Sequence, residues 1–295
     1  MTLEPTTTPA PSAGWRGKLA AAALGLALLA VLWFLIAALG TKFGLWSGPF
    51  GLDTLTLGLG RMIILLAASV SLTALIVSLL AAPRKQPFML ALGALLISAL
   101  AYGRVAAFHA LEERLPPLHD IQTDWTDPIQ PSDALYTERE AAGATNPLEE
   151  DPLIGMEAND RWPGTGGRRV AEVQEEAEFD TATHEKPREK PYPRIAPLVM
   201  PVSAEQAYTA ALAAVTERGW TIVMEDEETG RIDASEESFW FGFREDIMIR
   251  VTATEDGARI DVRSASRNRL SDLGTNARRI RDLLDEIEAR IAKGV

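Results

Sequence analysis

The sequence predicts three N-terminal transmembrane helices followed by a C-terminal α+β domain, in which helices pack on one face of an antiparallel meander sheet. Three observations support this fold class: long apolar runs before residue 112, a change in charge near Pro117, and strand-like alternation between two amphipathic helices. The 295 residues carry a net charge of −12. Residues 1–117 contain 8 basic and 4 acidic side chains, whereas the remainder contains 21 and 37. An apolar half therefore precedes a strongly acidic half.

The composition excludes several kinds of function. Without cysteine there is no disulfide, no thiolate nucleophile and no cysteine-based metal centre. The acidic balance argues against nucleic acid as a partner, because such binding depends on excess Lys and Arg. The sequence also lacks a Gly-x-Ser-x-Gly elbow and a His-Glu-x-x-His pair. We therefore predict no catalytic residue and no cofactor.

The membrane half contains three uncharged or nearly uncharged runs, at 19–41, 62–82 and 86–103, the last extended by 105–111. About 20 apolar residues are enough to cross a bilayer. The first run is longer than the apolar core of a signal peptide, and two more runs follow it, so we interpret it as a retained anchor. The expected parts are a short tail at 1–17 and a three-helix region at 18–111.

The orientation follows from the basic residues beside the spans. Basic residues are equal in number on the two sides, but Arg16 and Lys18 outweigh Lys42 across the first span. We therefore expect a cytoplasmic N-terminus and an extracytoplasmic C-terminal domain. No Asp, Glu or Lys lies within a span, and intramembrane ionisable residues usually mark transport pathways. The helices are accordingly predicted to anchor the protein in the bilayer.

Residues 115–137 form a juxtamembrane segment that is rich in carboxylates. Asp120, Asp124 and Asp127 follow His119 within nine residues and could offer oxygen ligands to a hard cation. Their spacing does not match an EF-hand, and Asp-Pro and Thr-Asp pairs are equally typical of turns. These three residues are weak metal candidates, and no metal site is predicted.

Residues 138–190 contain 14 acidic residues, 7 basic residues and four prolines. This composition predicts a mostly disordered acidic linker, because it offers little apolar surface to offset the entropy cost of ordering. The Gly-rich stretch at 164–169 lacks the Lys-Ser/Thr of a phosphate-binding loop.

Residues 191–295 predict one α+β domain of ordinary size. Ser203 and Gln206 are typical of a capping box that starts a helix, and Gly219 marks its end. A last amphipathic helix is expected from about Ser271. Strands are expected at 220–225, 231–235, 239–243, 246–253 and 259–266.

One hairpin can be given a register. If Asp256 and Gly257 are the central residues of a two-residue turn, Arg250 lies directly opposite Arg263. Like charges in that position are unfavourable, and either a diagonal Asp261 or a bound anion would relieve them. The same register turns five aliphatic side chains toward the helices: Ile247, Ile249, Val251, Ile260 and Val262.

The candidate contacts for a ligand or partner are therefore Arg250, Arg263 and Arg267, with Asp246 beside them. A charge reversal at Arg263 is expected to abolish binding without unfolding the domain. Asp246 is interpreted as an ion-pair partner of Arg267 in preference to a general base, and Asp272 as a helix N-cap in preference to a catalytic acid.

Residues 263–280 read Arg-Ser-Ala-Ser-Arg-Asn-Arg-Leu-Ser-Asp-Leu-Gly-Thr-Asn-Ala-Arg-Arg-Ile. This run resembles the signature of the family known as domain of unknown function 1499. His119-Asp-Ile-Gln-Thr-Asp124 and Phe241-Gly-Phe-Arg-Glu-Asp246 are similar to further motifs of that family. Arg269 and Leu270 depart from it, since the family usually has Gly and a basic residue there. The motif residues are His119, Asp120, Asp124, Ser264, Ser266, Asp272, Asn276 and Arg279.

The resemblance implies a bacterial envelope setting and no established activity. We therefore expect a non-enzymatic protein of the bacterial inner membrane, embedded in the lipid bilayer, whose periplasmic domain binds an envelope protein or an anionic ligand. Two alternatives remain open. One is an envelope hydrolase or metal-dependent enzyme that uses the juxtamembrane carboxylates, and the other is an accessory subunit of a larger membrane complex.

Overall fold

The computed structural model describes residues 14–179 and 192–294. The chain divides into two compact units, Met1–Phe108 and His109–Val295. The first 13 residues of the predicted tail lie outside the described part of the chain. Each unit is built around apolar side chains of its own.

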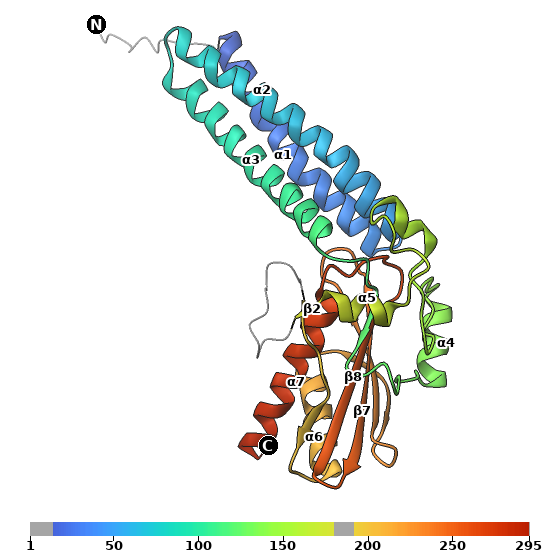
Figure 1. Ribbon diagram of the computed structural model, residues 1–295. Helices are drawn as coiled ribbons and strands as arrows, with labels where there is room; N and C mark the ends of the chain where they lie inside the picture. Colours follow the sequence, from blue (N-terminus) through green and yellow to red (C-terminus); the bar gives the residue numbers. More distant parts are fainter. Residues whose placement is uncertain (1–13, 180–191, 295) are drawn as a thin grey trace, which may run out of the picture. The chain divides into compact units, whose positions relative to one another are not determined.

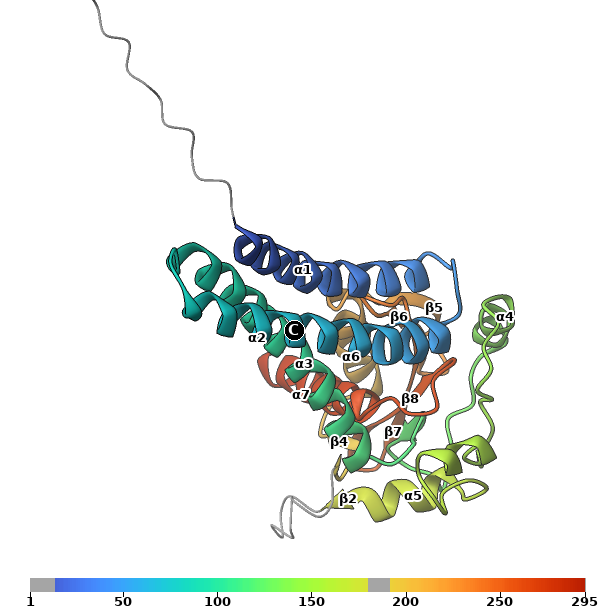
Figure 2. The same cartoon turned by 90° about the horizontal axis from the view of Figure 1, so that it is seen from above.

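The first unit confirms the three predicted spans. Three helices are long and apolar enough to cross a membrane: α1 (Trp15–Lys42), the continuous pair η1 and α2 (Phe50–Gly60 and Arg61–Leu80), and α3 (Lys85–Arg114). They run side by side in Figure 2. Small residues pack between them while many leucines stay exposed, as expected when lipid surrounds a helix bundle. The packed alanines are Ala20, Ala23, Ala27, Ala67, Ala74, Ala91 and Ala94.

The second unit contains the predicted antiparallel meander, with two additional strands. Its sheet has the order β1-β8-β7-β6-β5, and β4 also pairs with β8. The additional strands β1 and β4 pair with successive parts of the free edge of β8. In chain order the strands are β1 (Asp120–Gln122), β4 (Leu198–Met200), β5 (Thr221–Asp226), β6 (Arg231–Glu237), β7 (Arg244–Thr254) and β8 (Gly257–Ser266).

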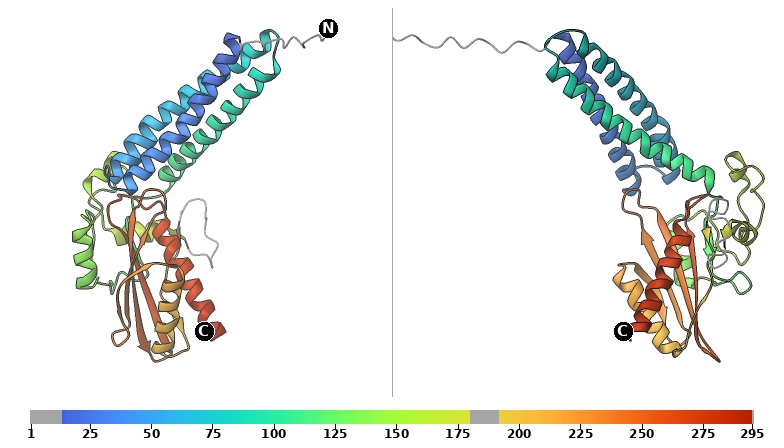
Figure 3. Two further views of the ribbon diagram at one scale, coloured as in Figure 1. Left: turned by 180° about the vertical axis from the view of Figure 1, so that it is seen from behind. Right: turned by 60° about the vertical axis from the view of Figure 1, so that its left-hand side comes forward.

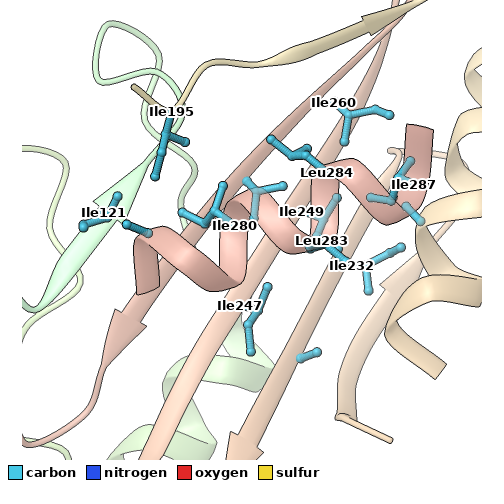
Figure 4. Packing of buried hydrophobic residues seen from close by; sticks show 14 of the residues in the cluster. Ile121, Ile195, Ile232, Ile247, Ile249, Ile260, Ile280, Leu283, Leu284 and Ile287 are labelled. Carbon is cyan, nitrogen blue, oxygen red and sulfur yellow. The ribbon is translucent and has the colours of Figure 1, made fainter. Parts of the chain in front are cut away.

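Two helices cover one face of this sheet, as the sequence predicts. They are α6 (Ala204–Glu217) and α7 (Thr275–Lys293). Figure 4 shows the isoleucines of the strands meeting the apolar stripe of α7. The capping box of Ser203 and Gln206 is present at the start of α6. Helix α7 starts later than the sequence predicts, because Leu273 and Gly274 both have left-handed backbones, with φ of 54° and 75°.

The predicted hairpin register is wrong by two residues. Arg250 lies opposite Asp261, and Arg263 lies opposite Met248. The turn contains Glu255 and Asp256, and Gly257 follows it with a φ of 132°. A side chain at Gly257 would meet the carbonyl of the neighbouring strand β4, so glycine is required here for that approach. The shift is even, so the aliphatic side chains still face the helices.

Residues 239–243 are not a strand. They form a tight loop between β6 and β7, in which the amide of Ser238 donates to the carbonyl of Phe243 at 2.8 Å. Gly242 has a φ of 67°, so the backbone is not extended at this residue and the strand conformation is interrupted there. Aromatic residues favour strands in sequence, but here they belong to a loop.

Residues 138–179 are folded, in contrast to the disordered linker that their composition predicts. This stretch contains the end of α4 (Asp133–Ala141), the short helix η2 (Met156–Asp160), and α5 (Val170–Ala177), followed by β2 (Glu178–Phe179), which pairs with β3 (Tyr192–Pro193). A few apolar side chains at helical spacing enter the core of the domain, while the charges remain outside. Residues 180–191 of the predicted linker lie outside the described residues.

Residues 123–150, here called the cover segment, lie on the face of the sheet opposite to α6 and α7. Ile129, Leu135 and Leu148 pack against Met248 and Ala265 of the sheet. Figures 1 and 3 show α4 on one side of strands β7 and β8, and α7 on the other. The sheet is therefore covered on both faces, so arginines expected on an open face are enclosed.

Candidate functional site

Most of the motif residues gather at one end of the sheet, where β1 and β7 begin and β8 ends. Asp120 and Asp246 both lie opposite Ala265, on either side of β8. Because side chains alternate along a strand, successive residues such as Arg263 and Ser264 point to opposite faces of the sheet, and the motif residues form two networks. The cover-side network contains Asp120, Glu138, Arg139, Asp246, Arg263 and Arg267, and the helix-side network contains Glu236, Glu245, Ser264, Ser266, Asp272, Asn276 and Arg279.

The centre of the cover-side network is the guanidinium group of Arg263. Its Nη2 donates to Asp120 Oδ2 at 2.5 Å, and its Nε donates to Asp120 Oδ1 at 3.0 Å. Nη1 donates to the carbonyl of Ile129 at 2.7 Å, and Nη2 to that of Glu149 at 2.7 Å. The Arg263 and Asp120 side chains are both 0% exposed. Arg263 therefore connects β8 to β1 and to both ends of the cover segment.

A second group of ion pairs surrounds Asp246. Arg267 Nε and Nη2 donate to Asp246 Oδ1 at 2.9 and 2.6 Å, and Arg139 of α4 pairs with the other carboxylate oxygen. Arg267 also pairs with Glu138 at 3.0 Å. The Asp246 side chain is completely buried, and two guanidinium groups neutralise it. This arrangement attaches α4 to the sheet.

The three juxtamembrane carboxylates do not converge on one point. Asp120 is bound by Arg263, Asp124 by Arg259 at 2.6 Å, and Asp127 by Arg250 at 2.9 Å. Within residues 14–179 and 192–294, no group of three His, Cys, Asp or Glu side chains could hold a metal ion.

The pKa of Asp124 is lowered to about 2, first by the Thr126 hydroxyl and then by Arg259. The Asp124 carboxylate is therefore held in its charged form.

The helix-side network is a chain of hydrogen bonds between β8 and α7. Ser264 Oγ donates to Asn276 Oδ1 at 3.0 Å, and Asn276 Nδ2 donates to the carbonyl of His119 at 3.1 Å. Arg279 Nη1 donates to Ser264 Oγ at 3.0 Å, while its Nε donates to Glu236 at 2.8 Å. These contacts fix the start of α7 against the end of β8 and the start of β1.

Two acidic groups in the helix-side network are buried at a cost. Burial raises the pKa of Glu245, although Arg269 and Arg279 partly offset the effect and Ser266 Oγ donates to its carboxylate. Burial also raises the pKa of Asp272. The Asp272 carboxylate accepts hydrogen bonds from the amides of Gly274, at 2.9 Å, and Asn276. It thus stabilises the start of α7 from two residues before the N-cap, Gly274.

His119 lies beside the helix-side network and is 5% exposed. Burial lowers its pKa, and its Nε2 has no hydrogen-bond partner among the described residues. The Tyr192 hydroxyl is also buried without such a partner, and burial raises its pKa. Burial therefore favours the neutral forms of both His119 and Tyr192, as is usual in a packed protein interior.

The predicted contact residues have the following positions. Arg263 and Arg267 lie in the interior, and the Arg250 side chain is 16% exposed with Asp127 and Asp261 as partners. Arg250 and Arg263 are not directly opposite each other, so the repulsion that suggested a bound anion is absent. The position of Arg263 argues against the expectation that a charge reversal there leaves the fold intact, because its buried guanidinium group donates hydrogen bonds to Asp120 and to the carbonyls of Ile129 and Glu149.

Sequence reasoning did not identify Arg139 and Glu245 as members of these networks, nor Arg259 as the partner of Asp124. Arg139 lies in the stretch expected to be disordered, which removed it from consideration. The available signal was the capped start of α4, where Ser132 accepts from the amide of Leu135 at 3.2 Å and leucine and tyrosine follow.

A family model described as a protein of unknown function (DUF1499) matches residues 120–287. No curated protein matches the chain. The matched region begins at Asp120, the carboxylate bound by Arg263, and contains both polar networks.

Proposed function

This chain belongs to the DUF1499 family, and we propose that it is a non-enzymatic protein of the bacterial inner membrane whose periplasmic α+β domain binds an envelope protein. The three apolar helices support membrane association. The proposed setting follows the family resemblance, and the proposed orientation follows the basic residues beside the first span.

The observation that carries this proposal is the internal neutralisation of the carboxylates. Asp120, Asp124 and Asp246 are each bound by at least one guanidinium group. The oxygens of these carboxylates already accept hydrogen bonds from arginines of the domain, so they are not presented to a substrate or a metal ion. The residues on which a hydrolase or a metal-dependent enzyme would depend therefore act as structural ion pairs.

The same pairs favour a protein partner over an anionic ligand. The guanidinium groups expected to receive an anion already bind carboxylates of the domain. Residues 118–295 also carry a net charge of −16, from 21 basic and 37 acidic residues, which repels anions at long range. A protein with a basic or apolar contact surface fits this domain better.

We place the partner contact on the folded stretch that composition presents as a linker. Leu153 and Met156 are 52% and 66% exposed, although they lie in a segment whose backbone is fixed. The amide of Ile154 donates to the carbonyl of Arg168 at 2.9 Å, and Ile154 itself is buried. Exposed apolar side chains on a rigid segment are suited to protein contact.

The orientation can be tested with single cysteines, since the chain has none of its own. Lys85→Cys lies at the first residue of α3, next to the loop from the second span, and Glu255→Cys lies at the β7–β8 turn. In intact spheroplasts, a membrane-impermeant maleimide should label position 255 and leave position 85 unlabelled until the membrane is disrupted. The reverse result would place the domain in the cytoplasm and contradict the proposed setting.

The partner can be tested by photo-cross-linking in native membranes. A photoreactive amino acid at Leu153 or Met156 should give one discrete cross-linked product that is heavier than the chain. The same residue at the exposed Glu255 is the matched control and should give none. If neither position 153 nor position 156 gives a product, the proposed contact is rejected. It is also rejected if positions 153, 156 and 255 all give the same products.

A further inference from the structure

The loop between β6 and β7, residues 238–243, is an aromatic loop with a fixed shape. The amide of Phe243 donates to Ser238 Oγ at 2.9 Å, and the amide of Gly242 donates to the carbonyl of Ser238 at 3.1 Å. Together with the Ser238–Phe243 backbone bond, these contacts close the loop. Its conformation is therefore set before it meets any partner.

The four aromatic residues of this loop have two roles. The rings of Phe241 and Phe243 stack with centroids 5.4 Å apart, and the Arg269 guanidinium group lies 5.3 Å from the centroid of Phe243. Phe239 and Trp240 meet edge to face at 5.0 Å and are 75% and 46% exposed. The inner pair braces the loop, whereas the outer pair presents a large apolar surface to the surroundings.

The aromatic loop lies at the end of the sheet where the chain arrives from its third apolar helix. Helix α3 ends at Arg114, and Asp120 begins β1. The carbonyl of His119 accepts from the amide of Ser266 at 2.7 Å, and the amide of Arg267 donates to the carbonyl of Arg244 at 3.1 Å. The start of β1, the end of β8 and the start of β7 therefore lie at the same end of the sheet.

The chain length between Arg114 and β1 sets an upper limit on the distance from the end of α3 to this end of the sheet. The six steps from Arg114 to Asp120 extend at most about 20 Å. The two strand spacings from β1 across β8 to β7 add about 10 Å sideways. By contrast, the β7–β8 turn lies at the other end of the 11-residue strand β7, about 30 Å away.

We infer that the aromatic loop is a second membrane contact, in which Phe239 and Trp240 enter the headgroup region of the bilayer that the three helices span. Tryptophan and phenylalanine suit this region, because an aromatic body enters the apolar side while the indole N–H stays hydrated. The contact restricts the orientation of the domain on its short tether. It requires the three spans but no protein partner, so it goes beyond the function proposed above.

The test uses the full chain with one cysteine, Phe239→Cys, carrying a nitroxide label. The matched control is Glu255→Cys at the far end of β7. Both proteins are reconstituted into vesicles of phosphatidylcholine and phosphatidylglycerol, and electron paramagnetic resonance measures collisions with oxygen, which concentrates in lipid, and with a water-soluble nickel chelate. The ratio of oxygen to nickel collisions at position 239 should be several-fold higher than at position 255.

Equal, water-like ratios at positions 239 and 255 would overturn the inference. Low collision rates with both reagents at position 239 would also overturn it, because they would indicate burial against protein. A second label at Trp240→Cys should show the same lipid-like ratio as position 239. Since the vesicles contain only lipid and this chain, these outcomes are independent of the partner proposed above.

Discussion

Arg263 and Asp120 form an ion pair in which both side chains are completely buried. They are separated by 143 positions in the sequence, yet they lie on adjacent strands. This pair holds the strand that follows the third span against the central hairpin of the domain. It explains why motif residues near both ends of the domain belong to one folding unit.

Breaking this pair should severely destabilise the domain. Asp120→Ala leaves a buried guanidinium group without its counter-charge, which costs about 3–5 kcal/mol. Urea unfolding of the full chain in detergent, followed by near-ultraviolet circular dichroism, measures the change. Asp127→Ala is the control, because the Asp127 side chain is 72% exposed and a surface pair contributes at most about 1 kcal/mol. Similar losses for the two variants would contradict a special role for the buried pair.

Arg139 should determine whether α4 stays on the sheet. Arg139→Ala removes one of the two guanidinium groups on Asp246 and the contact with the carbonyl of Asn146. A local loss of about 3 kcal/mol would accelerate amide hydrogen exchange about 100-fold in residues 133–150. Arg168→Ala removes an exposed pair with Glu176 and should leave exchange in this segment unchanged. Unchanged exchange in Arg139→Ala would show that apolar packing alone holds α4.

Glu245 should make the domain less stable as the pH rises. Burial raises its pKa above 4.5, so the native state retains a proton that the unfolded chain releases. This contribution to stability is complete below pH 4.5 and is lost as the pH rises through the native pKa. Glu245→Gln should therefore unfold at higher urea concentration than the wild type at pH 7, with a smaller difference at pH 4. The exposed Glu228→Gln is the control, and a pH-independent effect of Glu245→Gln would oppose this explanation.

Gly257 should tolerate alanine less well than Gly219 does. Both have positive φ, but a Cβ at Gly257 would lie 2.1 Å from the carbonyl oxygen of Met200, whereas one at Gly219 would meet nothing within 4 Å. Gly219→Ala should cost about 1 kcal/mol from backbone strain alone. Gly257→Ala should cost more and increase hydrogen exchange in β4. Equal losses in urea unfolding would show that close approach of β4 does not constrain this position.

The sequence by itself determined the elements with strong local signals. Apolar runs of sufficient length predicted the three helices of the first unit, and the Ser203–Gln206 capping box predicted the start of α6. Alternation along β7 and β8 predicted which side chains face α7. The motif near the C-terminus and the two motifs before it indicated the family, because they depend on residue order and not on contacts.

Tertiary structure decided the register, the linker and the role of the arginines. The turn lies one position earlier than an Asp-Gly pair suggests, and strand β4 lies close to Gly257. The folded stretch at 138–179 gains its order from a few side chains that enter a core supplied by other segments. The composition of residues 138–179 alone does not indicate that such a core is present.

Which charged residues pair with each other was the feature that depended most on the fold. Arg263 and Asp120 are distant in sequence, and whether an arginine binds a ligand or a carboxylate of its own chain depends on which strand lies beside it. Local propensity and hydrophobic period act over a few residues and are therefore visible in sequence. Pairing between distant charges acts only after the sheet and its cover segment have assembled.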